Sequence, residues 1–165
     1  MIELLDKKHQ RENFNCGNEL LNFYLKTQAN QDIKRKLSVC FVFSDAETHK
    51  IKGYYTLSNN SIPLRFFSEE IQKKIPKSYQ SLPTILIGRL AVDVNFHGQG
   101  LGKLLLQEVE TRAKLAQNKF LFLNVNKYNK AKEFYEKLNY KVIKDEVIDI
   151  GKGYVMDDYV MEKGI

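Results

Sequence analysis

The chain has 165 residues, 43% of them hydrophobic, and a formal net charge of +6. This length and apolar content predict a single domain over residues 1–165 that folds around its own core. No internal repeat, signal core or membrane-length apolar run is present, so we expect no membrane association. Cys16 and Cys40 are isolated and lack metal-ligand spacing, which favours reduced cysteines, no metal site and a cytoplasmic protein.

The first half of the chain predicts a short strand, a helix and a β-hairpin. The strand begins at Glu3. The helix begins at Asn18, or in the turn just before it, and carries apolar residues at helical spacing as far as Ala29. Two β-branched and aromatic runs, 39–43 and 51–57, are separated by a polar stretch, which is typical of a hairpin.

The second half alternates strands with helices after an irregular section over 63–83. Such alternation, with a strand–helix–strand unit in the middle, predicts an α/β chain with a mixed sheet covered by helices. The expected strands are 85–92, 120–125, 140–148 and 154–161, and the expected helices lie near 69–74, from Gly102 onward, and over 131–138.

The most informative segment joins the strand 85–92 to the following helix through a turn that contains Gly98, Gly100 and Gly102. Glycine permits close backbone approaches that a side chain would block. The unpaired N–H groups and the dipole at a helix start bind anions. The turn therefore predicts a site for a phosphate-bearing cofactor.

Two common phosphate-binding loops do not match this turn. A nucleotide P-loop needs Ser or Thr after its Gly-Lys pair, but Leu104 stands there, and His97 occupies the position of the first glycine. The dinucleotide fingerprint G-x-G-x-x-G fails because Lys103 follows Gly98 and Gly100 at its last position. No acidic residue follows at the spacing that holds a ribose. Both loops are excluded.

What remains resembles motif A of the GCN5-related N-acetyltransferase (GNAT) family: Gln or Arg, two residues, Gly, one residue, then Gly or Ala. Here His97 stands at the Gln/Arg position and is followed by 98–102. The segment 131–142 resembles a second family element, A-x-x-x-Y-x-K-x-G-F, with Tyr135 at the tyrosine. Asn139 replaces the usual glycine and tolerates the left-handed conformation at a helix end. The resemblance implies the GNAT fold, a central, mostly antiparallel sheet with a splayed parallel strand pair and flanking helices.

The same resemblance implies acetyl-CoA as the cofactor. Tyr135 would protonate the departing thiolate, and the motif favours this role over the alternative of a packing residue on an amphipathic helix. A backbone N–H near Val92 is a candidate oxyanion donor. Lys103 either adds charge at the pyrophosphate or faces solvent as an ordinary helix residue. The residues assigned to the cofactor are Leu90, Ala91, Val92 and Val94 along the pantetheine arm, His97, Gly98, Gln99, Gly100, Leu101, Gly102 and Lys103 at the pyrophosphate, and Asn129.

Segments 14–32, 53–63 and 87–93 carry a narrower resemblance, to the toxin acetyltransferases of bacterial toxin–antitoxin pairs. Those enzymes acetylate the α-amine of aminoacyl-tRNA, usually form homodimers, and are neutralised by a small ribbon-helix-helix antitoxin. No general base stands out in the sequence. An α-amine has a pKa of about 7.7–8.0, against about 10.4 for a lysine side chain, so it is more readily deprotonated without a base. In this interpretation one of Tyr54 and Tyr55 faces the core and the other a substrate groove.

Positive charge is concentrated from Arg112 to Lys144, with nine basic and two acidic residues, whereas the tail from Asp145 is acidic. On charge alone a solvated lysine-rich face is the simpler interpretation, but an RNA substrate would give these residues phosphates to bind. Two alternatives stay open: acetylation of a protein N-terminus, lysine or polyamine, and a CoA-binding module without catalysis. The candidate phosphate contacts are Arg89, Lys34, Arg35, Lys36, Lys127, Lys130 and Lys132.

Overall fold

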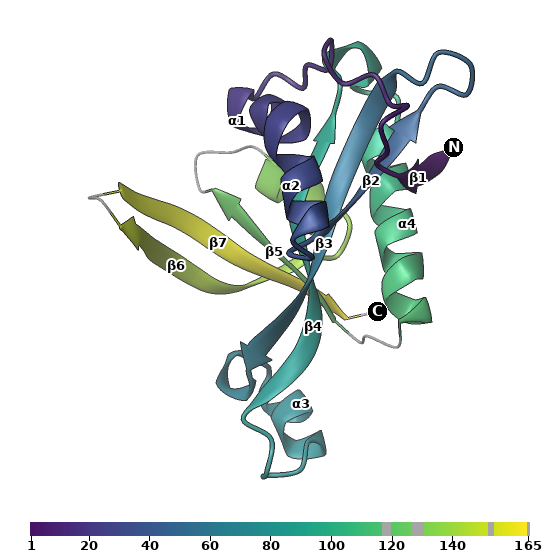
Figure 1. Cartoon of the computed structure of the whole chain (residues 1–165). Coiled ribbons are helices and arrows are strands. Elements are labelled where there is room, and N and C mark those ends of the chain that lie inside the picture. Colours follow the sequence, from purple (N-terminus) through teal and green to yellow (C-terminus); the bar gives the residue numbers. More distant parts are fainter. Residues whose placement is uncertain (117–119, 127–130, 152–153, 165) are drawn as a thin grey trace. The chain divides into compact units, whose positions relative to one another are not determined.

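The computed structural model describes residues 1–116, 120–126, 131–151 and 154–164 (Figure 1). They form two compact units, the first made of Met1–Ser58 and Ile87–Arg112 and the second of Asn59–Leu86 and Ala113–Ile165. The strands follow the order β1-β2-β3-β4-β5-β7-β6 in a sheet flanked by helices. The predicted α/β class with a helix-covered sheet is therefore confirmed.

Every element expected from the sequence is present, and the main differences are in strand length. β3 continues to Pro63 and β4 already begins at Ser81, so the section expected to be irregular is partly strand. The hydroxyls of Ser61 and Ser81 lie 2.7 Å apart, which shows how polar residues continue the pairing where the apolar pattern ends. The strands are β1 (Ile2–Leu4), β2 (Val39–Ser44), β3 (Ile51–Pro63), β4 (Ser81–Val92), β5 (Phe120–Asn126), β6 (Lys141–Gly151) and β7 (Tyr154–Gly164). The helices are α1 (Glu19–Phe23), η1 (Tyr24–Gln28), α2 (Ala29–Lys34), η2 (Leu64–Phe66), α3 (Glu69–Lys74), η3 (Val94–Phe96), α4 (Leu101–Leu115) and α5 (Ala131–Glu136).

The first helix begins at Asn18, as predicted. The Asn18 side chain accepts hydrogen bonds from the backbone N–H groups of Leu20 and Leu21, which satisfies donors that have no partner within the helix. The helix then widens into the π-helical turn η1 before it continues as α2. It ends at Lys34, and Lys36, two residues later, has a φ of 59° in the left-handed region that commonly follows a helix.

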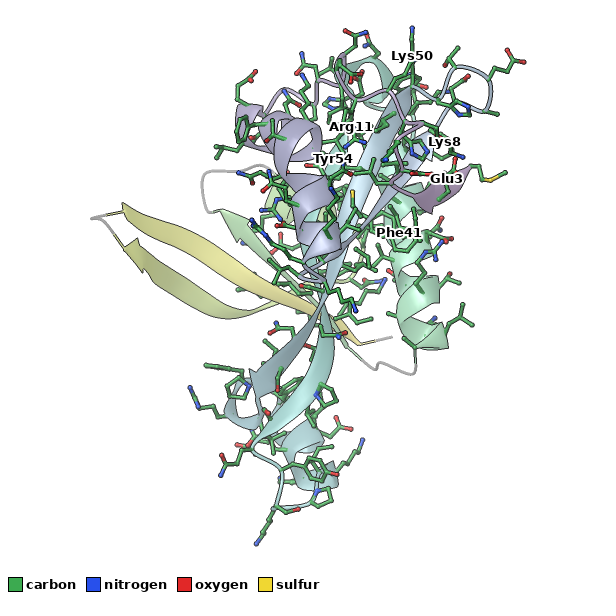
Figure 2. The ribbon with its side chains drawn as sticks, viewed as in Figure 1. Glu3, Lys8, Arg11, Phe41, Lys50 and Tyr54 are labelled. Carbon is green, nitrogen blue, oxygen red and sulfur yellow. The ribbon has the colours of Figure 1, made fainter. Side chains whose placement is uncertain are left out.

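In the first unit, β2 and β3 form an antiparallel pair that is covered on both faces. Val42 and Tyr54 pack with Leu25 of η1 in one buried cluster. On the other face, the ring of Phe41 stacks on Tyr55, 5.2 Å between centroids, on the side of α4. Figure 2 shows Tyr54 and Phe41 pointing to these opposite faces.

Tyr54 and Tyr55 are both fully buried, so the prediction that one of them faces a groove is wrong. The Tyr54 hydroxyl donates to the Leu21 carbonyl at 2.9 Å. The Tyr55 hydroxyl accepts a hydrogen bond from Arg112 Nε at 3.0 Å. Because helices cover both faces of β3, alternate side chains are equally enclosed.

The helix α4 lies close to β3 because residue 53 is glycine. A Cβ there would lie 3.0 Å from a Leu105 methyl and 3.1 Å from the Ala91 carbonyl oxygen. Leu105 and Val109 are fully buried on the inner side of α4. This packing fixes the start of α4, and with it the glycine turn, against the sheet.

The second unit contains a small cluster of its own, in which Phe67 and Leu82 are buried among partly buried residues such as Ile71 of α3. β7 pairs antiparallel with both β5 and β6. Asn139, just after α5, has a φ of 66°, as expected of a residue that replaces the helix-ending glycine.

Candidate active site

The end of β4 is anchored by a buried carboxylate that the sequence analysis did not single out. Asp93 is 5% exposed. Its oxygens accept hydrogen bonds from the backbone N–H groups of Asn15 and Asn95, both at 3.0 Å, and from the Asn95 side chain at 2.8 Å. The Asp-x-Asn pattern after a strand was the available signal, since aspartate caps such turns. The network joins the loop before α1 to the segment that leads into the glycine turn.

The glycine turn has the backbone conformation that its sequence predicts. Gly98 and Gly100 have φ values of 73° and 78°, and a Cβ at either position would meet no atom within 4 Å. Both glycines are therefore required by conformation rather than by packing. Among the described residues, no acceptor bonds the backbone N–H groups from Gly98 to Lys103. This start of α4 can receive an anion.

The side chains of the turn bond back to the protein. His97 Nε2–H donates to the Val92 carbonyl oxygen at 2.7 Å, which fixes the tautomer of the ring. Gln99 Nε2 donates to the Asn95 carbonyl oxygen at 3.0 Å. The backbone N–H groups of the turn thus have no acceptor among the described residues, while these two side chains bond back to the chain before the turn. A cofactor contact by the His97 ring stays a prediction.

The residues expected along the pantetheine arm, at the end of β4 and just after it, differ in burial and in their backbone hydrogen bonds. Leu90 and Val92 are half-buried and Ala91 is buried. The Val94 side chain is exposed, but its backbone N–H already donates to the Asn15 carbonyl oxygen at 2.8 Å. Its carbonyl oxygen accepts a hydrogen bond from the His97 N–H at 3.3 Å, so both backbone groups of Val94 already bond the protein, and a pantetheine contact there stays a prediction.

A pocket of about 300 Å³ opens beside the glycine turn and includes the exposed Leu104. Lys52, which lines it, is paired with Asp45 at 3.0 Å. Lys103 is exposed on the first turn of α4. The pocket is lined by Phe43, Lys52, Phe96, Gln99, Gly100, Leu101 and Leu104.

The candidate phosphate contacts lie in different surroundings. Lys34, Arg35 and Lys36 are exposed at the end of α2, and none forms an ion pair with a described residue. Arg89 is half-buried with its guanidinium over the Tyr24 ring. Lys132 pairs with Glu136 at 3.3 Å. The predictions for Asn129, Lys127 and Lys130 lie outside the described residues.

In the second unit, Tyr135 lies on α5 and is 8% exposed. Its ring makes edge contacts with Phe134 and Tyr140, at 5.3 Å and 5.6 Å between centroids. Burial raises the pKa of its phenol to about 12. No described residue hydrogen-bonds its hydroxyl, so both predicted roles, packing and proton donation, fit this side chain.

In the part of the chain that the structure describes, no helix is long and apolar enough to span a membrane. The same residues contain no cluster of three or more His, Cys, Asp or Glu side chains placed to bind a metal ion.

Comparison with known proteins agrees with the two sequence motifs. The acetyltransferase (GNAT) domain family matches residues 77–162. A tRNA-acetylating toxin of Mycobacterium tuberculosis (strain ATCC 25618 / H37Rv) is 30% identical over 95 residues, which cover 58% of this chain and 54% of the relative. The chain thus spans about half the length of that curated relative.

Two solved structures are similar over most of their length. AtaT complexed with acetyl-methionyl-tRNAfMet has a TM-score of 0.77 and 26% identity, covering 97% of this chain and 92% of that one. A tyrosine-to-phenylalanine mutant of KacT has a TM-score of 0.76 and 27% identity, with the same coverage. The GNAT fold expected from the sequence is confirmed. The chain belongs to the GNAT family of N-acetyltransferases.

Proposed function

We propose that this protein transfers the acetyl group of acetyl-CoA to the α-amine of an aminoacyl-tRNA and acts as the toxin of a toxin–antitoxin pair. The observation that carries the proposal is the glycine turn at the start of α4, whose N–H groups have no acceptor among the described residues. It occurs on a fold shared with relatives named for tRNA acetylation.

The residues of the turn fit the pyrophosphate of coenzyme A. Their N–H groups have no acceptor among the described residues, and the left-handed glycines keep side chains away from them. The backbone from Gln99 to Lys103 would hold the phosphates, and Leu90, Ala91 and Val92 would bond the pantetheine arm. When bound, acetyl-CoA supplies the thioester from which the amine takes the acetyl group.

Tyr135 is suited to hold a proton on its hydroxyl oxygen. Because burial raises its pKa to about 12, the phenol stays protonated throughout the physiological range. A neutral phenol can donate to a sulfur that leaves as thiolate. Its hydroxyl is not used by another described residue, which is expected of a donor reserved for substrate.

Two features favour an α-amine on RNA as the acceptor: the sequence offers no evident general base, and basic side chains are exposed at the end of α2. An α-amine at about pKa 7.7–8.0 is partly neutral at pH 7, so no strong base is required. The exposed charges of Lys34, Arg35 and Lys36 suit an RNA backbone. The sequence resemblance to toxin acetyltransferases further supports a homodimer and a ribbon-helix-helix antitoxin as partners.

The proposal is tested by transfer of labelled acetyl from acetyl-CoA to bulk charged tRNA, with the Tyr135→Phe variant in parallel. We expect label on the aminoacyl group and much less in the variant. Label absent from RNA, while the enzyme still releases coenzyme A slowly, would overturn the proposal. The acceptor would then be sought among protein N-termini, lysines and polyamines.

A further inference from the structure

Arg89 lies on β4 with its guanidinium stacked on an aromatic ring. Its Cζ atom is 3.5 Å from the centroid of the Tyr24 ring. Tyr24 is 2% exposed, whereas Arg89 is half-buried. Both residues belong to the first unit. The ring supports one face of the guanidinium, and the planar N–H edge is left for other contacts.

The position of the Tyr24 ring is fixed from two sides. Tyr24 begins the π-helical turn η1, in which the Ala29 N–H bonds the Tyr24 carbonyl five residues back. Such turns shift side chains relative to a regular helix and often occur at functional sites. The Tyr24 hydroxyl donates to the Asp32 carboxylate at 3.0 Å and lies 3.4 Å from Ser38 Oγ. A phenol that donates to a carboxylate has a more electron-rich ring, which strengthens its attraction for a cation.

The Arg89 guanidinium has no acceptor among the described residues. It forms no ion pair and no hydrogen bond there, and its one contact of this kind is with the Tyr24 ring. The nearby Asp32 carboxylate bonds Tyr24 instead. None of the Arg89 nitrogens is among the buried, unpartnered side-chain atoms of the described residues, so its N–H groups are open to solvent or to a ligand. Its five N–H groups form a rigid fork that matches carboxylate and phosphate oxygens.

We infer that Arg89 binds a phosphodiester of the RNA substrate beside the aminoacyl group, and that Tyr24 and Asp32 position its guanidinium. The inference rests on the proposed function. Arg89 directly precedes Leu90, and at about 3.3 Å per residue it lies within about 10 Å of Val92 along β4. In an aminoacyl-tRNA the amino acid's carboxyl is esterified, so the anion nearest to the α-amine is the phosphate of the terminal nucleotide. Arg89 holds that phosphate, and Tyr24 is a positioning residue.

The test compares two acceptors that carry the same amino acid. One is charged tRNA; the other is the aminoacyl-adenosine released from it by ribonuclease cleavage after the penultimate cytidine, which carries no phosphate. For Arg89→Gln we expect kcat/KM on charged tRNA to fall about 10- to 100-fold, as for loss of a charged hydrogen bond. Activity on the aminoacyl-adenosine and the KM for acetyl-CoA stay unchanged.

Salt dependence gives a second readout that a structural role would not change. Loss of one phosphate contact makes the slope of log kcat/KM against log salt shallower by about 0.7 for single-stranded RNA. This slope decides the matter where aminoacyl-adenosine reacts too slowly to measure. Arg65→Gln is the matched control, because Arg65 is exposed and lies over the Phe66 ring at 4.7 Å. We expect it to retain the wild-type slope.

The positioning role is tested at Tyr24. Tyr24→Phe keeps the ring and is expected to retain charged-tRNA activity within about threefold, whereas Tyr24→Leu removes the ring and reproduces the Arg89→Gln loss. An unchanged salt slope in Arg89→Gln, an equal loss on both acceptors, or a raised KM for acetyl-CoA would each overturn the inference. If the wild-type enzyme acetylates no charged tRNA, the proposed function itself fails, and the inference fails with it.

Discussion

Two arginines of the first unit lie over aromatic rings, and they differ in whether other described residues bond their guanidinium groups. Arg112 lies 3.9 Å from the Phe41 ring, pairs with Glu108 at 2.7 Å and donates to Tyr55 at 3.0 Å. Arg89 has only the Tyr24 ring among the described residues. The first guanidinium is bonded by the protein, and the second leaves its N–H groups open to solvent or to a ligand.

Tyr54 and Tyr135 differ in the same way, in whether another described residue bonds the hydroxyl. Tyr54 is buried and donates its hydroxyl to the Leu21 carbonyl. Tyr135 is nearly as buried, but its hydroxyl bonds no described residue. The Tyr135 hydroxyl oxygen is also not among the buried, unpartnered side-chain atoms of the described residues, so it is open to solvent or to a ligand. The Tyr54 hydroxyl is therefore used within the fold, whereas the Tyr135 hydroxyl is available to a ligand.

The largest effect is expected at the tyrosines. Tyr135→Phe removes a proton donor, so kcat should fall about 10²- to 10⁴-fold while stability changes little. The matched variant Tyr54→Phe removes an internal hydrogen bond, so stability should fall by about 1 kcal/mol while kcat is retained. Steady-state kinetics and urea unfolding measure both. Equal kcat values for the two variants would break the comparison.

Stability should separate the two arginines. Arg112→Met leaves the Tyr55 hydroxyl buried without its donor and Glu108 without its cation, so we expect a loss of about 1–3 kcal/mol in unfolding free energy. Arg89→Met leaves no described group unpaired, so the loss should stay below about 1 kcal/mol. Urea unfolding at neutral pH measures both. A larger loss for Arg89→Met would assign that residue a structural role.

Gly100 and Gly53 allow the same test for the backbone, because the first lies in open space and the second in a packed contact. Gly100→Ala places a Cβ in open space at a φ of 78°, so the left-handed conformation costs about 1–2 kcal/mol, and affinity for acetyl-CoA should fall about tenfold. Gly53→Ala would crowd Leu105 and Ala91 and should destabilise the fold by about 1–3 kcal/mol. Calorimetric titration with acetyl-CoA and urea unfolding separate the effects. Unchanged acetyl-CoA affinity in Gly100→Ala would remove the turn from the cofactor site.

What the sequence predicts well is local. The Asn18 cap, the left-handed Asn139 and the conformation of the glycine turn each follow from one residue and its neighbours. The strands and helices follow from apolar periodicity. The glycine turn is therefore identifiable from the sequence without knowledge of any tertiary contact.

What the sequence does not predict depends on contacts between distant segments. The Asp93 network bonds Asn15, 78 residues away. The burial of both Tyr54 and Tyr55 depends on two helices that cover opposite faces of β3. The stacking of Arg89 on Tyr24 depends on a π-helical turn that no residue pattern signals, and the phosphate contact predicted for Arg89 stays a prediction.

The smallest expected effect is an absence of change at high pH. Burial raises the pKa of the Tyr135 phenol to about 12, so its hydroxyl keeps the proton that a solvent-exposed tyrosine loses near pH 10. The acceptor amine must instead lose its proton, so kcat/KM should rise to a plateau above about pH 8 and stay level to about pH 10. Single-turnover assays corrected for alkaline ester hydrolysis measure this profile. A descending limb centred near pH 10 would mean that Tyr135 titrates like a solvent-exposed phenol. That outcome would contradict the raised pKa expected from burial.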